Sequence, residues 1–353
     1  MSSVKDVLLE RVRSAVEKLR GLRKPVTVDV FRRIALLEPD RFVVYGYTRR
    51  KPLAVFNPGA LVIGRDLYIF PRLIFDYYWY VSSIGIAKLD IEELLDGYIP
   101  SVIEAKILLY PRTRYENGRG CEDARALLDG DKLVVLYTAV GTRHPDCCIP
   151  IPRQGYAEFT WSSLSEIRRD VIKIATDSRA EATDDWKDSA IIARKSTVYT
   201  MLTRPMLRDY IACWRCILRI DDLSIPIESL EPILVPEEWE YKVGWSTNAV
   251  RLDGDAYLVG WHGVAQEDFS YRNGIAVVDS DGRLLGITNY ILSPRDIVEL
   301  YGDRPYVIFG CGLVRYRELL LWIGGISDHA IAVYIAELDK VLEHVRWVGE
   351  GRR

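Results

Sequence analysis

The sequence predicts an all-β protein, a five-bladed β-propeller preceded by a short helical N-terminal extension. After about residue 41, short runs rich in Val, Ile, Tyr and Trp alternate with turns of Gly, Asp, Asn and Pro. This texture is typical of antiparallel strands joined by tight turns. A hairpin motif also recurs at nearly even intervals along the chain, which is the usual mark of a repeat architecture.

Each hairpin motif consists of an apolar strand, a polar turn and a second strand with an aromatic or β-branched centre. The five motifs span residues 60–69, 126–137, 191–201, 249–258 and 312–322, with turns centred on Gly64, Gly130, Lys195, Gly254 and Arg317. Successive turns are 66, 65, 59 and 63 residues apart. Such repeats suit five small antiparallel sheets around a central channel. The alternative is a pair of β-sandwiches, in which the even spacing would be accidental.

The N-terminal segment has helical rather than strand-like periodicity. Apolar residues recur three or four positions apart at Val4, Leu8, Val12, Ala15 and Leu19. This pattern predicts an amphipathic helix over residues 4–20, and a second short helix is predicted over 27–37. Short helices are also expected at Ile91–Leu95 and Ile297–Tyr301.

We therefore expect a helical extension over residues 1–40 and a catalytic propeller domain over 41–353. The apolar face of the first helix must pack either on the propeller or on another subunit. Because a propeller closes its own core without such a helix, the sequence favours a homo-oligomer assembled through it.

Composition excludes several classes of partner. The chain has 353 residues, 27% of them charged, with a net charge of −3. Without a basic excess, binding to nucleic acid or to an anionic membrane is not expected. No apolar run approaches the roughly 18 residues of a membrane span. The charged N-terminus lacks the apolar core of a signal peptide, so a cytoplasmic location is expected.

The cysteines do not predict a metal site. Cys213 and Cys216 have the spacing of half a zinc site or a redox motif, but they lie in a strand-like segment and point to opposite faces. Core packing is therefore the favoured interpretation. Cys147 and Cys148 follow a histidine and an aspartate but lack a second ligand pair elsewhere. We expect neither a metal nor a bound cofactor.

The most informative stretch runs from Tyr115 to Arg125. Two glycines precede the adjacent carboxylates Glu122 and Asp123, and Arg125 follows them. Neighbours in an extended strand point to opposite sides. The sequence therefore predicts that Asp123 faces a site while Glu122 points to the other side. A solvated charged loop is the plain alternative.

Other polar residues stand just before or after the hairpins. The full set is Asn57, Arg72, Glu122, Asp123, Arg125, Asp188, Arg204, Lys242, His262 and Asp328. Equivalent ends of equivalent strands meet at one mouth of a propeller channel, so we expect these side chains to share one pocket. Carboxylates mixed with cations suit a polyhydroxylated substrate together with an anion. Singly, each residue has an ordinary alternative, such as an ion pair or a core histidine, so the prediction rests on their shared register.

In their order along the chain, these segments resemble glycoside hydrolase family 130, the mannoside phosphorylases and related mannosidases, which are five-bladed propellers. The matching segments are Asn57–Ala60, Gly120–Arg125, Lys187–Ala190 with Arg204–Pro205, Lys242–Gly244, Trp261–Val264, Cys311–Leu313 and Gly325–Asp328. Three departures mark a distant member. Ala124 replaces the proline of the family's Gly-x-Glu-Asp-Pro-Arg signature, and the segment Lys187–Ala190 lacks the usual Phe-Pro after its alanine. Within Tyr241–Ala249, the run Trp245, Ser246, Thr247 and Asn248 stands where the family is usually rich in glycine and proline.

The resemblance implies an inverting glycoside phosphorylase that converts β-mannosides or related oligosaccharides to a sugar 1-phosphate. Inorganic phosphate would be the co-substrate, and no cofactor is implied. By the same resemblance Asp123 is the proton donor, and Arg204, Lys242 and His262 hold phosphate. The remaining site residues, Asn57, Arg72, Glu122, Arg125, Asp188 and Asp328, are expected to bind the sugar.

Two alternatives stay open at this point. The protein could be a β-mannoside hydrolase with Glu267 or Asp268 as the base, or a sugar-binding propeller without turnover. An inverting hydrolase needs a second carboxylate to activate water, whereas phosphate is already charged and needs cations to hold it. The retained cations favour phosphorolysis.

Overall fold

The computed structural model describes residues 3–144, 149–177, 179–207 and 210–349, which are mostly β-strands. The first sheet is β1 (Arg32–Leu37), β24 (Ala330–Glu337), β23 (Leu319–Ile326) and β22 (Ile308–Tyr316), in that order. Another comprises β18 (Glu240–Arg251), β19 (Ala256–Ala265), β20 (Tyr271–Asp279), β21 (Leu284–Ile287) and β25 (Arg346–Trp347). The all-β prediction is confirmed.

Two larger sheets complete the described part of the chain. One contains β10 (Glu166–Val171), β9 (Ile151–Thr160), β8 (Lys132–Gly141), β7 (Gly120–Asp129), β5 (Ser82–Asp90), β4 (Asp66–Ile74) and β3 (Ala54–Ile63), with β6 (Ile103–Leu109) and β2 (Phe42–Tyr45) paired at its side. The other contains β12 (Ala180–Ala182), β11 (Lys173–Ala175), β16 (Ser224–Pro226), β15 (Cys213–Arg219), β14 (Val198–Pro205) and β13 (Trp186–Lys195), with β17 (Glu231–Leu234).

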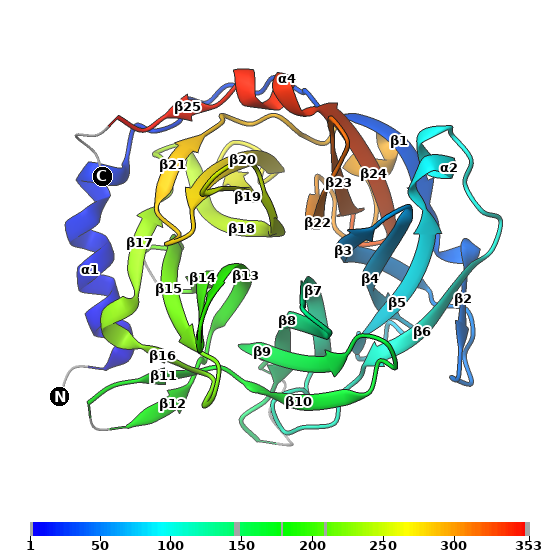
Figure 1. The fold of residues 1–353 in the computed structure, drawn as a ribbon, viewed down its shortest axis with the longest axis horizontal. Helices are drawn as coiled ribbons and strands as arrows, with labels where there is room; N and C mark the ends of the chain where they lie inside the picture. The colour runs from blue at the N-terminus through cyan, green and yellow to red at the C-terminus, as the bar shows by residue number, and fades with distance from the viewer. Residues whose placement is uncertain (1–2, 145–148, 178, 208–209, 350–353) are drawn as a thin grey trace.

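The sheets are arranged in a ring around a central axis (Figure 1). Among the described strands, β3, β7, β13, β18 and β22 are innermost, and each contacts the next around the ring, with β22 returning to β3. In the sheet that contains both β3 and β7, strands β5 and β7 are joined by a single bridge, between Ser82 and Gly120. The first residues of the inner strands therefore converge at one mouth of the ring.

All five predicted hairpins are confirmed. They are the antiparallel pairs β3–β4, β7–β8, β13–β14, β18–β19 and β22–β23. Each turn contains one residue with positive φ, namely Gly64, Gly130, Ser196, Gly254 and Arg317. Glycine adopts this conformation without steric cost, which explains its place in three of these five turns.

The N-terminal helix α1 (Val4–Leu19) is confirmed, as are α2 (Ile91–Leu95) and α3 (Ile297–Leu300). The other helical segments in the described part of the chain are η1 (Pro39–Arg41), η2 (Ile227–Ser229) and α4 (Leu338–Glu343). The helix predicted over residues 27–37 is wrong, because this segment contains strand β1, which pairs antiparallel with β24. Without β1, β24 would present an open sheet edge with unpaired backbone groups, so remote pairing overrides local preference.

Helix α1 packs against its own chain. Leu8, Val12 and Val16 are buried in a cluster that includes Leu230 and Val235. Arg11 on the same helix donates to the backbone oxygens of Ile227 and Leu230, at 2.5 and 3.1 Å. The apolar face that motivated the expectation of a homo-oligomer is thus covered within one subunit, and oligomerisation stays a prediction without that support.

We expect Leu8→Ala to lower the free energy of unfolding by about 2–5 kcal/mol, because it opens a cavity in a fully buried cluster. Chemical denaturation measures this change. Glu17→Ala, on the exposed side of the same helix, is the matched control and should change stability by less than about 0.5 kcal/mol. Equal effects of the two substitutions would contradict the packing described here.

Cys213 and Cys216 are buried and form no disulfide, which confirms core packing for this pair. Cys147 and Cys148 lie outside the described residues. Within residues 3–144, 149–177, 179–207 and 210–349, no group of three or more His, Cys, Asp and Glu side chains is arranged to hold a metal ion. In those same ranges, no helix has the length and apolar character needed to cross a bilayer.

Candidate active site

A cavity of about 200 Å³ opens where the inner strands converge. Its lining residues are Asn57, Arg72, Tyr80, Arg119, Glu122, Asp123, Lys187, Asp188, Arg204, Lys242, His262, Tyr271, Arg304, Val307, Phe309 and Asp328. Nine of the ten residues predicted from the sequence are in this set, and Arg125 is the exception. The structure therefore brings together side chains that are up to about 270 positions apart in the sequence.

On three inner strands, the same backbone irregularity turns a polar side chain toward the cavity. Asn57, Asp123 and Asp188 have φ values of 46°, 54° and 56°, and each lies at a break in the pairing register of its strand. Asn and Asp tolerate this left-handed conformation better than most residues. A β-bulge re-aims the side chains around it, so residue type and strand irregularity together build the site.

The prediction that Glu122 and Asp123 point to opposite sides is wrong, since both line the cavity. The pairing of β7 with β8 shifts between Glu122 and Arg125, and the left-handed conformation of Asp123 interrupts the alternation of a regular strand. Arg72 contacts both carboxylates, with nitrogen–oxygen distances of 2.8 Å to Glu122 and 3.5 Å to Asp123. Burial raises the pKa of Glu122, although Arg72 opposes this effect.

Asp123 is buried and held in a defined orientation. The side-chain amide of Asn57 donates a hydrogen bond of 2.9 Å to its Oδ1 atom. Arg72 lies against the same oxygen and is itself fixed by a 2.8 Å bond from its Nε to Ser82 Oγ. A carboxyl group fixed in this way within a polar cavity is suitable for proton transfer to a bound substrate.

Arg125 lies behind the cavity wall and does not line the cavity, in contrast to the expectation that it binds substrate. Its guanidinium donates to the backbone oxygens of Asp123 and Ser246, both at 2.8 Å, and contacts Asp188 Oδ1 at 3.2 Å. It thus links strands β7, β13 and β18 across the ring. Arg125 is therefore placed to hold the backbone of Asp123 and the carboxylate of Asp188 in position.

Basic residues gather on the side formed by β13, β14, β18 and β19. Asp188 Oδ2 accepts a 2.7 Å hydrogen bond from Arg204 Nε. Burial alone would raise the pKa of Asp188, but Arg204 and Arg125 outweigh it and lower that pKa well below its ordinary value. Arg204 is therefore firmly oriented by a permanent carboxylate partner.

Arg204 and His262 converge over Gly244. A Cβ atom at Gly244 would lie 2.9 Å from Arg204 Nε and 2.7 Å from His262 Nε2, so the two side chains fit only because this residue is glycine. The other ring nitrogen of His262, Nδ1, is 3.0 Å from Ser246 Oγ. The His262 ring stacks on Tyr271, with ring centroids 5.4 Å apart.

Lys242 completes this basic side of the cavity. Its Nζ atom donates to the Tyr271 hydroxyl at 2.8 Å, and within the described residues no carboxylate forms an ion pair with it. Burial lowers its pKa to about 6, and the nearby charges of Arg204 and Lys187 act in the same direction. Burial likewise lowers the pKa of His262. The surroundings therefore disfavour the protonated forms of Lys242 and His262 unless an anion is bound.

The charge balance of the whole cavity shows the same excess. Counted over the described lining residues, six Lys and Arg side chains, namely Arg72, Arg119, Lys187, Arg204, Lys242 and Arg304, stand against four carboxyl groups, namely Glu122, Asp123, Asp188 and Asp328. Burial raises the pKa of Asp328, against the influence of Arg72 and Arg304. A bound anion would balance this excess.

Several lining residues were not predicted. Lys187 belongs to the matching segment Lys187–Ala190, and Arg119 lies within the stretch Tyr115–Arg125, so their positions beside Asp188 and Gly120 were available signals. Arg304 lies in a loop without a motif, so no sequence signal marked it. It donates to the Tyr271 hydroxyl at 2.9 Å, the same oxygen that accepts from Lys242. Tyr271 therefore joins two basic side chains from different parts of the chain.

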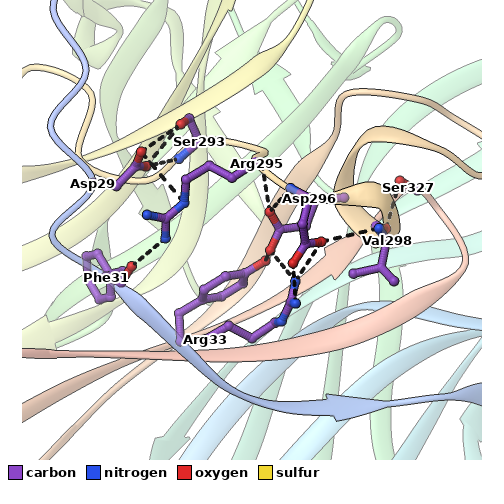
Figure 2. Close-up of polar contacts among 10 residues, drawn as sticks. Asp29, Phe31, Arg33, Ser293, Arg295, Asp296, Val298 and Ser327 are labelled. Atoms are coloured by element: carbon purple, nitrogen blue, oxygen red, sulfur yellow. Dashed lines mark hydrogen bonds and ion pairs between the residues drawn. The ribbon is translucent and has the colours of Figure 1, made fainter.

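The loop that precedes Arg304 is fastened to the N-terminal segment by a polar cluster (Figure 2). Arg33 on β1 donates to Asp296 at 3.1 Å and to Glu299 at 2.6 Å. Glu299 is buried and also accepts a 2.8 Å bond from the Tyr334 hydroxyl. Nearby, Asp29 accepts from the backbone nitrogen of Ser293 at 2.7 Å.

This cluster reaches the cavity through Ser327. The Ser327 hydroxyl donates to the backbone oxygen of Val298 at 3.2 Å. The backbone oxygen of Ser327 accepts a hydrogen bond from the backbone nitrogen of Arg304 at 3.0 Å. Ser327 and Asp328 have φ values of 48° and 52°, so the turn that presents Asp328 to the cavity is unusual in shape. The N-terminal strand thus contributes to the positions of Arg304 and Asp328.

Glu267 and Asp268, the bases expected for a hydrolase, do not line the cavity. Both are exposed, and Asp268 is paired with Arg272 at 3.0 Å. They lie in the turn between β19 and β20. The structure therefore gives no support to either residue as an activator of water in this cavity.

Comparison with known proteins identifies the family. The model of glycoside hydrolase family 130, described as β-1,4-mannooligosaccharide phosphorylase, matches residues 21–347. A β-1,2-mannobiose phosphorylase from Thermoanaerobacter sp. (strain X514) is 26% identical over 304 residues, which cover 82% of this chain and 91% of that relative.

Solved structures share the fold. The β-1,2-mannobiose phosphorylase from Listeria innocua, solved with β-1,2-mannobiose, matches with a TM-score of 0.66 at 18% identity, covering 88% of this chain and 96% of that one. MPT-4, a mannose phosphorylase from Leishmania mexicana solved with a phosphate ion, matches with a TM-score of 0.58 at 14% identity, covering 99% and 98%. Because the family model spans nearly all of the sequence, the chain belongs to glycoside hydrolase family 130.

Proposed function

We propose that this protein is an inverting glycoside phosphorylase that cleaves β-mannosides with inorganic phosphate and releases a sugar 1-phosphate. The observation that carries the proposal is the excess of basic over acidic side chains in the cavity, with Arg204, Lys242 and His262 together on one side of it. An anion is the chemical partner that this excess favours. The relatives named as mannobiose and mannose phosphorylases support this choice of substrate class.

In the proposed reaction, Asp123 gives its proton toward the glycosidic oxygen, through a hydroxyl group of the bound sugar. An oxygen of phosphate attacks the anomeric carbon from the opposite face as the glycosidic bond breaks. The leaving sugar gains the proton, and the configuration at the anomeric carbon inverts. Asn57 and Arg72 orient the carboxyl group of Asp123, while Arg204 and Lys242 orient the attacking anion.

Asn57, Arg72, Glu122, Asp188 and Asp328 also line the cavity, so we propose that they contact the sugar. Asp188 holds Arg204 as well, and it would therefore link the sugar side to the phosphate side. No cofactor takes part in this scheme. Arg125 acts indirectly, because it fixes the backbone of Asp123 and the carboxylate of Asp188.

We also propose that the ring is a five-bladed propeller. The hydrogen-bonded sheet that contains β3 and β7 consists of two meanders, β3–β6 and β7–β10, which only the Ser82–Gly120 bridge joins among the described strands. Dividing them at that bridge leaves five units, each with one innermost strand. The catalytic domain would then begin near β1, earlier than residue 41, because β1 completes the sheet of β22–β24.

The test is the phosphate dependence of product formation. With β-1,2- or β-1,4-mannobiose as substrate, we expect mannose 1-phosphate and mannose in equal amounts, and only when phosphate is present. Ion chromatography separates the sugar phosphate from free mannose. Release of mannose alone, at a rate independent of phosphate, would show a hydrolase. Binding of these sugars without turnover would show a non-catalytic protein.

A further inference from the structure

Arg304 is a basic residue of the cavity wall that lies outside every segment of the family resemblance. It belongs to the loop between α3 and β22. Its Nη2 atom donates to the Tyr271 hydroxyl at 2.9 Å, and its guanidinium carbon lies 4.9 Å from the centre of the Tyr271 ring. Asp328 is near enough for Arg304 to oppose the rise that burial causes in its pKa. Within the described residues, however, no carboxylate forms an ion pair with Arg304, so its charge is available to a ligand.

Three other basic side chains gather near Tyr271, and each is less available to an incoming anion. Arg204 is paired with Asp188, with 2.6 Å between Nη2 and Oδ2. Burial lowers the pKa of Lys242 to about 6 and also lowers that of His262, so neither carries a full charge in the empty cavity at neutral pH. An arginine guanidinium keeps its charge throughout this range. Of these four side chains, Arg304 is the one that combines a permanent charge with no carboxylate partner in the described part of the chain.

The hydroxyl of Tyr271 brings Arg304 and Lys242 to one point. Its oxygen accepts from Lys242 Nζ at 2.8 Å and from Arg304 Nη2 at 2.9 Å. Lys242 Nζ also lies 5.0 Å from the centre of the same ring. Two nitrogen atoms that share one acceptor are close enough to bond to different oxygens of one phosphate group. The arrangement therefore aims a permanent donor and a titrating donor at the same position.

The loop that carries Arg304 is held in place from two sides. Gly302 packs so closely on Ser327 that a Cβ atom at this glycine would lie 2.5 Å from Ser327 Cβ. The backbone nitrogen of Arg304 donates to the oxygen of Ser327 at 3.0 Å, and the oxygen of Tyr306 accepts from the backbone nitrogen of Tyr271 at 2.9 Å. Upstream, the polar cluster of Figure 2 fastens the same segment to β1. A side chain that is ordered before its ligand arrives loses less entropy on binding.

From these observations we propose that Arg304 is a further phosphate-binding residue, which holds one oxygen of the anion while Lys242 holds another. The inference rests on the proposed function. In this arrangement the charge of Arg304 is present before the anion arrives, and it attracts phosphate into the cavity at neutral pH. Lys242 gains its proton only as the anion binds. The phosphate site thus includes a residue from a loop that no motif marks.

The experiment measures sulfate binding by calorimetric titration between about pH 5 and pH 8, in wild type, Arg304→Met and Arg304→Lys. At pH 5, where Lys242 is charged, Arg304→Met should raise the Kd for sulfate by at least about tenfold, because it removes a charge-assisted hydrogen bond. Arg304→Lys keeps the charge and should raise the Kd by only about threefold. Arg317→Met is the matched control, since Arg317 is exposed in the turn of the β22–β23 hairpin, and should leave the Kd unchanged within about twofold.

The pH profile gives a readout that a purely structural role would not produce. Burial has the largest effect on the pKa of Lys242, and the charges of Arg204, Lys187 and Arg304 lower it further. Removing the charge of Arg304 should raise this pKa, so the pH above which the sulfate Kd begins to increase should move above about 6. The other titratable or charged groups that face Lys242 are the same in both proteins, namely Arg204, Lys187, Asp188, His262 and Tyr271.

Steady-state kinetics completes the test. Arg304→Met should raise the KM for phosphate by at least about tenfold and the KM for mannobiose by no more than about twofold. A sulfate Kd at pH 5 within about twofold of wild type would overturn the proposal. Equal losses in Arg304→Met and Arg304→Lys, or equal increases in both KM values, would also overturn it, because they would mean that Arg304 serves the shape of its loop.

Failure of this inference and failure of the proposed function give different results, because the sulfate titration does not require turnover. Weaker sulfate binding in Arg304→Met, in a protein that shows no phosphorolysis, would support Arg304 as an anion ligand and refute the reaction. Phosphate-dependent turnover with an unchanged KM for phosphate in Arg304→Met would refute the role of Arg304 and leave the reaction standing.

Discussion

Asp123→Asn is expected to lower kcat by at least about 100-fold, within the range of about 10²–10⁴ usual for loss of a general acid. The asparagine side chain has the same shape but carries no transferable proton. It retains an oxygen that can accept the hydrogen bond from Asn57. It also tolerates the left-handed backbone at this position, where φ is 54°. The fold and the binding of sugar should therefore persist while turnover fails.

Steady-state kinetics with saturating phosphate and mannobiose measures this loss, and calorimetry with the same sugar measures binding. Asp131→Asn is the matched control, since Asp131 is exposed in the turn of the same β7–β8 hairpin, at the opposite end from the cavity. The control should keep wild-type kcat. If Asp123→Asn retains activity within about tenfold of wild type, Asp123 is not the proton donor.

Lys242→Met is expected to raise the KM for phosphate by at least about tenfold and the KM for sugar by no more than about twofold. The substitution keeps an unbranched side chain against Tyr271 but removes the charge that we propose for the anion. Lys24→Met, on the exposed surface of the N-terminal segment, is the control and should change neither constant. Equal increases in the two KM values would mean that Lys242 serves the sugar or the fold instead.

The pH dependence of anion binding tests the same residue more sharply. In the empty cavity the pKa of Lys242 is lowered to about 6, so its positive charge is present below that pH and lost above it. An anion that needs the charge must then bind together with a proton. The Kd for sulfate, which does not titrate in this range, should be flat below about pH 6 and rise up to about tenfold per pH unit above it.

Calorimetric titration of sulfate between about pH 5 and pH 8 gives this slope, and two buffers of different ionisation enthalpy give the proton uptake directly. Lys242→Met should bind sulfate weakly and without the slope. A slope that persists in the variant would assign the proton to another group, and His262 would be the first candidate because burial lowers its pKa as well.

Periodic patterns in the sequence were sufficient for the regular parts of this protein. The apolar spacing of helix α1 and the turns at Gly64, Gly130 and Gly254 predict elements that the structure contains. These signals are local, because a helix or a hairpin is specified by residues a few positions apart. The shared register of polar residues also predicted nine residues of the cavity, since equivalent strand ends converge in a ring.

Only the tertiary structure decided the features that depend on remote backbone partners. The segment around β1 is a strand because the edge of β24 pairs with it. Glu122 reaches the cavity because a bulge on β7 breaks the alternation, and Arg125 turns away to backbone oxygens of another sheet. Arg304 joins the cavity through contacts with Tyr271 and Ser327. Bulges, sheet edges and loop positions are set by the assembled ring. The residues that form them follow no periodic pattern in the sequence, so the sequence alone does not predict them.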